Sequence, residues 1–131
     1  MTIEKEITCI ICPIGCKIII KKEGERLNIL KGNKCKKGIE YARNEIFDPR
    51  RMLTSLIRVE GGEWPLVSVK STDPVPKDKI FTILKEIHNT TIKAPIKSQQ
   101  VILKNVANTG INIITTRTVH LLKNNNFFYK R

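Results

Sequence analysis

The chain has 131 residues, with 24 Lys or Arg against 12 Asp or Glu, and its formal net charge at pH 7 is +12. This length is enough for one domain with a modest core, to which a metal site could add a small lobe of its own. No apolar run approaches the roughly 20 residues that a membrane-spanning helix needs, which excludes a membrane span.

The first elements in chain order are a strand, a hairpin and a helix. Residues 6–9 are predicted to form a short strand. The apolar runs at 17–22 and 27–31 predict a hairpin, with Gly24 supplying its turn. Residues 36–47 carry apolar side chains at helical spacing and are followed by Asp48-Pro49, which ends the predicted helix.

The following elements are a second hairpin and a second helix. Residues 53–60 and 64–70 are predicted strands joined across Gly61-Gly62. The helix is predicted over 76–89, because four apolar residues from Ile80 to Ile87 form one stripe and proline is favoured in a first helical turn.

The last part of the chain is predicted to add strands at 101–106 and 111–117, separated by the turn sequence Asn108-Thr109-Gly110. A final short strand is predicted at 119–122, and residues 123–131 are expected to be frayed. The fold class is therefore α+β. We expect a metal-binding lobe of hairpin and short helix at 1–50, followed at 51–131 by a small, mainly antiparallel sheet that one helix covers.

All four cysteines lie in the predicted lobe, with the spacing Cys9-x2-Cys12-x3-Cys16-x18-Cys35. Residues 1–8 include three charged side chains in place of a secretion signal, so we expect a cytoplasmic protein. Thiols stay reduced in the cytosol, where clustered cysteines bind metals or act in catalysis more often than they form disulfides. Pro13 and Gly15 indicate a tight turn, which also disfavours a thioredoxin-like dithiol.

Zinc and an iron-sulfur cluster are the two metal centres that this spacing allows. Structural zinc sites usually combine two knuckles of two ligands each, whereas these cysteines divide into three and one. Three thiolates from so short a segment are crowded around a single ion, but in a 4Fe-4S cubane each can bind its own iron. The spacing therefore favours a 4Fe-4S cluster held by Cys9, Cys12, Cys16 and Cys35, with zinc as the alternative.

Residues 5–65 resemble the N-terminal 4Fe-4S segment of molybdopterin oxidoreductases such as formate dehydrogenases and nitrate reductases. The likeness rests on the cysteine segment 9–16, on Gly32 before the last cysteine, on Lys37-Gly38 after it and on the segments 48–53 and 56–58. In that family the matching lysine lies between cluster and pterin, so the resemblance implies a cofactor-binding role for Lys37. The family continues for hundreds of residues that hold the pterin, and no pterin site is expected here.

The chain also resembles, over its whole length, a small bacterial family of uncharacterised function that has this cysteine pattern. Segments 94–97 and 105–117 carry that likeness. Its members are commonly encoded beside FAD-dependent dehydrogenases that act on glycerol 3-phosphate. The resemblance implies an accessory electron-transfer subunit that partners an FAD-dependent dehydrogenase and is not catalytic alone.

The positive charge is concentrated in the second part of the chain. Residues 1–50 contain 11 basic and 7 acidic residues, for a charge of +4, whereas residues 51–131 contain 13 and 5, for +8. Such a surplus attracts acidic proteins or phosphate backbones. Aromatic residues make up only 5% of the chain, which disfavours nucleic acid because single-strand binders stack bases on aromatic side chains.

The sequence thus predicts a 4Fe-4S electron-transfer protein that docks on an acidic redox partner. No phosphate-binding glycine loop or nucleophile motif indicates a reaction of its own. The alternative function is a zinc-stabilised binding module that contacts protein or nucleic acid.

Overall fold

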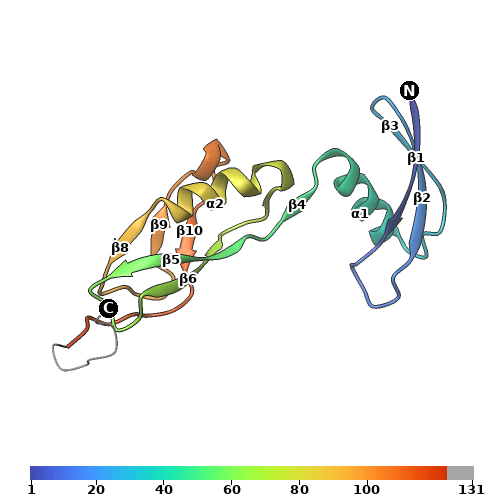
Figure 1. Ribbon diagram of the computed structural model, residues 1–131. Helices are drawn as coiled ribbons and strands as arrows, with labels where there is room; N and C mark the ends of the chain where they lie inside the picture. Colours follow the sequence, from blue (N-terminus) through green and yellow to red (C-terminus); the bar gives the residue numbers. More distant parts are fainter. Residues whose placement is uncertain (124–131) are drawn as a thin grey trace. The chain divides into compact units, whose positions relative to one another are not determined.

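The computed structural model describes residues 1–123, and its architecture is α+β, as the sequence predicts (Figure 1). The chain divides into two compact units, Met1–Arg50 and Arg51–Arg131, which we call the N-terminal and C-terminal units. Within the described range, no helix is long and apolar enough to cross a membrane. The predicted frayed tail, apart from Lys123, lies outside the described residues.

The N-terminal unit is a three-stranded antiparallel sheet with one helix. Strands β1 (Thr2–Thr8), β2 (Lys17–Glu23) and β3 (Arg26–Lys31) are arranged in that order, and helix α1 (Lys36–Phe47) follows. The predicted hairpin and helix are confirmed, and Gly24 adopts the positive φ of 58° that the turn requires. Strand β1 is longer than predicted because it pairs with β2 over its whole length.

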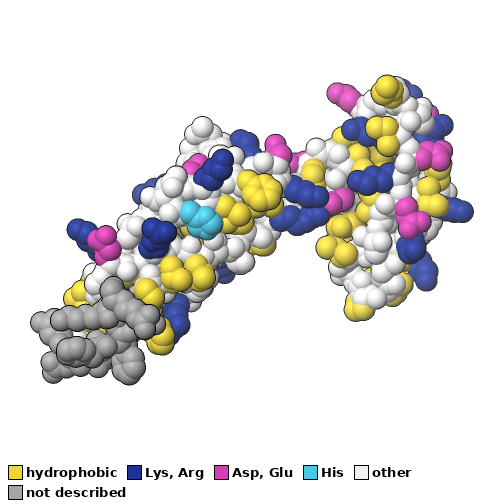
Figure 2. All heavy atoms as spheres, viewed as in Figure 1, with side chains coloured by type: hydrophobic (Ala, Val, Ile, Leu, Met, Phe, Trp, Pro, Cys, Tyr) yellow, Lys and Arg dark blue, Asp and Glu magenta, His cyan; other side chains and the backbone are white. Residues whose placement is uncertain are grey.

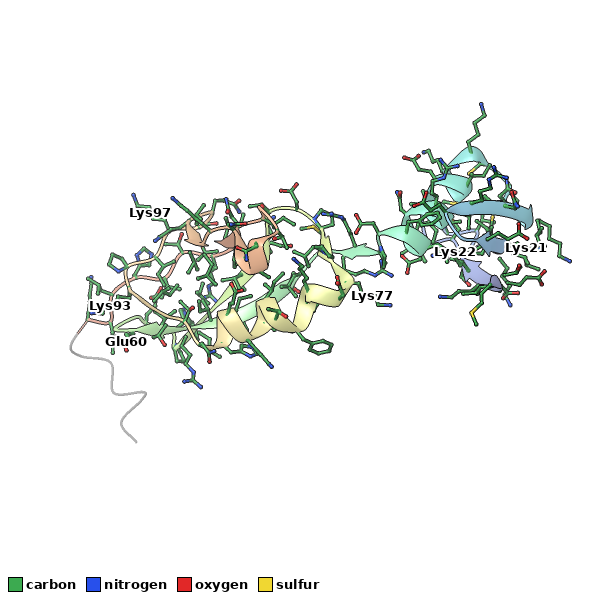
Figure 3. The ribbon with its side chains drawn as sticks, turned by 90° about the horizontal axis from the view of Figure 1, so that it is seen from above. Lys21, Lys22, Glu60, Lys77, Lys93 and Lys97 are labelled. Atoms are coloured by element: carbon green, nitrogen blue, oxygen red, sulfur yellow. The ribbon has the colours of Figure 1, made fainter. Side chains whose placement is uncertain are left out.

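The two faces of this sheet differ because successive strand residues point to opposite sides. Ile18 and Ile20 are fully buried and belong to one core cluster with Ala42 of α1. Lys21 and Lys22 are neighbours on β2 (Figure 3). Lys21 forms an ion pair with Glu23 at 2.9 Å. The ammonium nitrogen of Lys22 instead lies 4.9 Å from the centre of the aromatic ring of Phe47, the last residue of α1.

The C-terminal unit is built on a five-stranded sheet in the order β8-β5-β6-β10-β9. The pairings of β6 with β5 and β10, and of β10 with β9, are antiparallel, whereas β8 runs parallel to β5. A separate two-stranded ladder joins β4 to β7. The bounds are β4 (Arg50–Arg51), β5 (Thr54–Glu60), β6 (Leu66–Ser71), β7 (Val75–Pro76), β8 (Thr91–Lys93), β9 (Val101–Leu103) and β10 (Ile113–Thr115).

Helix α2 (Ile80–His88) contacts β5, and its apolar stripe enters the core of this unit. Ile83 and Ile87 are buried against the sheet residues Ile57 and Ile113 within one cluster. The 3-10 helix η1 (Lys77–Lys79) precedes α2, and a second one, η2 (Val106–Asn108), lies between β9 and β10. Figure 1 shows α2 along the sheet formed by β5, β6, β9 and β10.

The second helix is shorter than predicted. Pro76 is part of β7 with φ −54° and ψ 132°, and α2 begins only at Ile80, after the 3-10 turn. The prediction of a helix over 76–89 is therefore wrong at its start, because a first-turn proline fixes φ and leaves ψ free to be extended.

The last predicted strands are also shorter or absent. Strand β9 ends at Leu103, since Asn105 has a left-handed φ of 48° that breaks the ladder, and β10 spans only residues 113–115. The segment 119–122 is not a strand, and two isolated bridges tie it to Gly62 and Ile96. The parallel strand β8 was not predicted.

Candidate metal centre

The loop between β1 and β2 carries three of the four cysteines. The ladder ends with Thr8 opposite Lys17, so residues 9–16 form the loop. The amide of Cys9 donates a hydrogen bond of 2.8 Å to the carbonyl oxygen of Cys16. The first and third thiols are therefore held at the base of the loop by the strand pairing, and Cys12 lies within it.

The fourth cysteine returns to the same end of the sheet through a close backbone crossing. Strand β3 ends at Lys31, opposite Ile19, and the chain then passes Gly32 with φ +101°. A Cβ atom on Gly32 would overlap the carbonyl oxygen of Lys17, which directly follows Cys16. The crossing brings the segment before α1 against the base of the cysteine loop.

Cys35 is the N-cap residue of α1, and its carbonyl oxygen accepts a 3.2 Å hydrogen bond from the Gly38 amide. A Cβ on Gly38 would lie 3.0 Å from the Cδ1 of Ile18, so the first helical turn packs closely on β2. Figure 1 shows the β1–β2 loop and the start of α1 at the same end of the N-terminal unit.

The four thiols differ in exposure. Cys9 is 5% exposed and belongs to the core cluster of Ile7 and Ile18, whereas Cys16 is half-buried. Cys12 and Cys35 are exposed, and none of the four forms a disulfide. Among residues 1–123, no three or more His, Cys, Asp or Glu side chains are grouped as a metal site. The backbone gathers the cysteines at one end of the unit, but their thiols are not preassembled.

The surroundings of the cysteines are basic. Lys34, Lys36 and Lys37 are exposed on either side of Cys35, and the first turn of α1 has no acidic residue. Lys17 lies 3.5 Å from the Glu6 carboxylate, so its charge is partly balanced. Lys37, which the resemblance assigns to the cofactor, lies two residues after Cys35 in the first turn of the helix.

Two features near the cysteines were not anticipated from the sequence. Ile10, Ile11 and Ile14 are exposed to solvent, although apolar residues in a short loop would ordinarily be expected to pack. A shallow pocket of about 380 Å³ also follows one stripe of α1, lined by Lys36, Ile39, Glu40 and Arg43. The spacing of these four residues on a helix was visible in the sequence, but the exposure of the three isoleucines was not.

A family model matches helix α1 and most of the C-terminal unit, and its matched range does not include the cysteines. A family model described as "Protein of unknown function (DUF1667)" matches residues 36–117. A resemblance over the whole length was expected, and the matched range begins directly after Cys35 and ends at residue 117. The comparison with curated proteins gave no match.

A solved structure resembles part of the chain. The NMR structure of the Clostridium perfringens protein CPE0013, a structural genomics target, is 28% identical and has a TM-score of 0.52. The similarity covers 63% of this chain and 98% of that one. It supports a shared fold over the covered part.

Proposed function

The chain belongs to DUF1667, a protein family of unknown function, and we propose that it is a 4Fe-4S electron-transfer protein. In this proposal Cys9, Cys12, Cys16 and Cys35 hold the cluster, and Lys37 lies beside it. The protein acts as an accessory subunit of a redox enzyme and has no catalytic activity alone.

The observation that carries the proposal is the pair of backbone contacts at the base of the loop. The Cys9–Cys16 hydrogen bond joins the two ends of the cysteine loop, and the Gly32 crossing over Lys17 directs the fourth cysteine toward it. A hairpin alone would leave Cys35 without a fixed position relative to the other three. The exposed thiols of Cys12 and Cys35 can change rotamer rapidly and adjust to a cluster.

The donor set fits iron-sulfur chemistry. Thiolate is the usual protein ligand of a 4Fe-4S cluster, and four of them complete its ligation. When bound, such a cluster supplies the transfer of one electron at a time.

The chain's own residues have separate tasks. Cys9 is anchored in the apolar core, which fixes one ligand and excludes water from one side. Lys34, Lys36 and Lys37 add positive charge close to a centre that carries negative charge. Because salt screens charges beyond about 8 to 10 Å, only lysines adjacent to the sulfurs stabilise this negative charge.

The proposed partner is an FAD-dependent dehydrogenase, as the family resemblance implies. The net charge of +12 supports an acidic docking surface on that partner, since complementary charge steers association.

The decisive experiment is iron and sulfide analysis after anaerobic reconstitution of the full chain. We expect about four iron and four sulfide per chain and a broad absorbance that bleaches on reduction. The quadruple Cys→Ser variant, reconstituted in parallel, is the control for iron bound elsewhere. A colourless protein that retains one tightly bound zinc per chain under these conditions would refute the proposal.

That outcome would favour the second candidate, a zinc-stapled binding module. The charge of +8 on residues 51–131 is the observation that supports it. In this case zinc holds the N-terminal unit and the basic C-terminal unit contacts protein or nucleic acid. Retention on immobilised DNA that falls steeply with salt and is lost when the metal is removed would identify this function.

A further inference from the structure

The cysteine loop exposes an unusual amount of apolar surface. Ile10, Ile11 and Ile14 are 69%, 53% and 64% exposed, so three of the eight loop residues are isoleucines that face solvent. Figure 2 shows hydrophobic side chains at the end of the N-terminal unit where this loop lies. We call these three residues the isoleucine patch.

The patch is not explained by the packing of the loop itself. The core of the N-terminal unit is completed by Ile7, Cys9, Ile18, Ile20 and Ala42, all of which are buried without the three loop isoleucines. Isolated exposed apolar residues are common on protein surfaces, but a contiguous apolar patch often marks a binding site. Three exposed isoleucines within five consecutive residues of one loop concentrate apolar surface in one place.

The surroundings of the patch are basic. Neither the cysteine loop, residues 9–16, nor the segment 32–39 that returns to it contains an acidic residue. The second segment contributes Lys34, Lys36 and Lys37, all exposed. The end of the N-terminal unit thus combines exposed apolar side chains with these three positive ones, which we call the lysine rim. Protein interfaces commonly have an apolar centre and a polar rim.

We propose that the isoleucine patch is a docking site for an acidic protein whose own contact surface has an apolar centre. The inference rests on the proposed function and deepens it, because the partner then contacts the loop that carries three of the proposed cluster ligands. Apolar burial supplies affinity, whereas the lysine rim selects the sign of the partner's charge.

A second copy of the chain is a poorer occupant of the patch. In a two-fold dimer the same surface meets itself, which would bring the lysine rim of one copy against that of the other. Like charges in such a contact repel, and each copy carries a net charge of +12. Nucleic acid is also disfavoured, because isoleucine provides no ring on which bases can stack.

The test measures binding to two small redox proteins of opposite charge, flavodoxin as the acidic probe and cytochrome c as the basic one. Isothermal titration with the full chain is carried out at about 0.05 and about 0.5 M NaCl. We expect the chain to bind flavodoxin in preference to cytochrome c, and more weakly at the higher salt. The variant Ile10→Ser/Ile14→Ser should raise the Kd for flavodoxin about tenfold or more, because it removes apolar surface that the complex buries.

The matched control is Ile3→Ser, which removes an isoleucine that is 56% exposed on β1, away from the cysteine loop. It should leave the Kd unchanged. The charge variant Lys34→Glu/Lys36→Glu should weaken flavodoxin binding and reduce its dependence on salt. Equal binding of both probes, or equal effects of the patch and control variants, would overturn the docking proposal.

Two further measurements test the cluster proposal and the second-copy alternative separately from the docking proposal. Iron and sulfide analysis of every variant decides the cluster proposal independently, since titration detects binding whether or not the chain holds a cluster. Sedimentation of the chain alone tests the second-copy alternative. A dimer that the Ile10→Ser/Ile14→Ser variant dissociates would overturn the proposal of an acidic partner.

Discussion

Gly32 lies directly against the carbonyl oxygen of Lys17, so that no side chain can be accommodated at this point. Its φ of +101° is also a conformation that residues other than glycine rarely adopt. Both constraints arise where the chain leaves β3 and crosses toward α1. This contact couples the last cysteine to the loop that carries the first three.

Replacing Gly32 by alanine should therefore destabilise the N-terminal unit strongly. We expect Gly32→Ala to cost about 3 kcal/mol or more, since it adds both an atomic overlap and backbone strain. Urea unfolding followed through the amide NMR signals of β2 measures the loss. Gly24→Ala is the matched control, because Gly24 also has a positive φ but open space around it, and it should cost only about 1 kcal/mol. Equal losses would show that the crossing is not a tight contact.

The exposure of the cysteines allows ligand loss to be separated from packing loss. Cys12→Ser alters an exposed side chain, so it should leave the unloaded protein as stable as before but lower its iron content after reconstitution. Cys9→Ser should also destabilise the unloaded protein by about 1 kcal/mol or more, because it places a hydroxyl in the apolar core. Full iron loading of Cys12→Ser would remove Cys12 from the proposed ligand set.

Helix α2 is tied to the loop around η2 through Glu86, whose Oε1 accepts a 3.0 Å hydrogen bond from the Ala107 amide. Glu86→Ala removes this acceptor and should cost about 1–3 kcal/mol, because the partly buried amide loses its partner. Glu86→Gln keeps an oxygen in the same place and should cost less. Urea unfolding monitored by the fluorescence of Trp64, the only tryptophan, measures both. If the two variants lose the same stability, the hydrogen bond is not the cause.

The contact between Arg117 and Trp64 provides a second probe of the C-terminal unit. The guanidinium carbon lies 4.9 Å from the centre of the indole ring. Arg117→Gln should lower stability by about 0.5–1 kcal/mol and shift the fluorescence of Trp64 to longer wavelength as the ring gains contact with water. Arg58→Gln, which changes an exposed arginine on β5, is the control and should leave the spectrum unchanged.

The ion pair between Lys21 and Glu23 on β2 should make the stability of the N-terminal unit depend on pH. A hydrogen bond and the charge of Glu23 raise the pKa of Lys21 above its ordinary value. The stabilisation that goes with a raised lysine pKa is complete below the pKa of the unfolded chain and is lost as the pH rises through the folded pKa. Because the pair is exposed to solvent, the effect on stability should be small.

An NMR titration of the lysine side chains tests this prediction. Glu23→Gln should return the pKa of Lys21 toward its ordinary value, whereas Glu25→Gln, in the turn of the same hairpin, should not. A Lys21 pKa that is unchanged by Glu23→Gln would show that the pair does not persist in solution.

The elements that could be predicted from the sequence are those with local signals. Helix α1 begins and ends as predicted, because apolar spacing defines its body and Asp48-Pro49 stops it. The two hairpins are also confirmed, since each has a glycine at its turn. In these segments the pattern, the turn chemistry and the pairing agree.

The remaining elements depend on distant partners. Strand β8 is three residues long, too short for a periodic pattern, and it exists because β5 offers a parallel edge from residue 58 to residue 60. Strand β9 ends where Asn105 becomes left-handed, which its side chain allows but does not require. Neither feature can be read from the residues alone.

The candidate site also has features that can be predicted from the sequence and features that depend on the folded structure. The spacing of the cysteines is visible in the sequence, and Gly32 stands out beside them. That Cys9 is buried while Cys12 is exposed depends on which loop residues face the core. The exposure of Ile10 and its neighbours likewise appears only once the loop is seen not to fold back on the sheet.

The pairing order of the strands sets when each unit can be completed during synthesis. The sheet of the N-terminal unit joins neighbours along the chain, so it can form as soon as β3 has left the ribosome. In the C-terminal unit one edge of β6 stays unpaired until β10 has been synthesised, because Ile113 of β10 pairs with Ser71 of β6. The sheet that holds the base of the cysteine loop can therefore be complete while the sheet of the C-terminal unit still lacks β10.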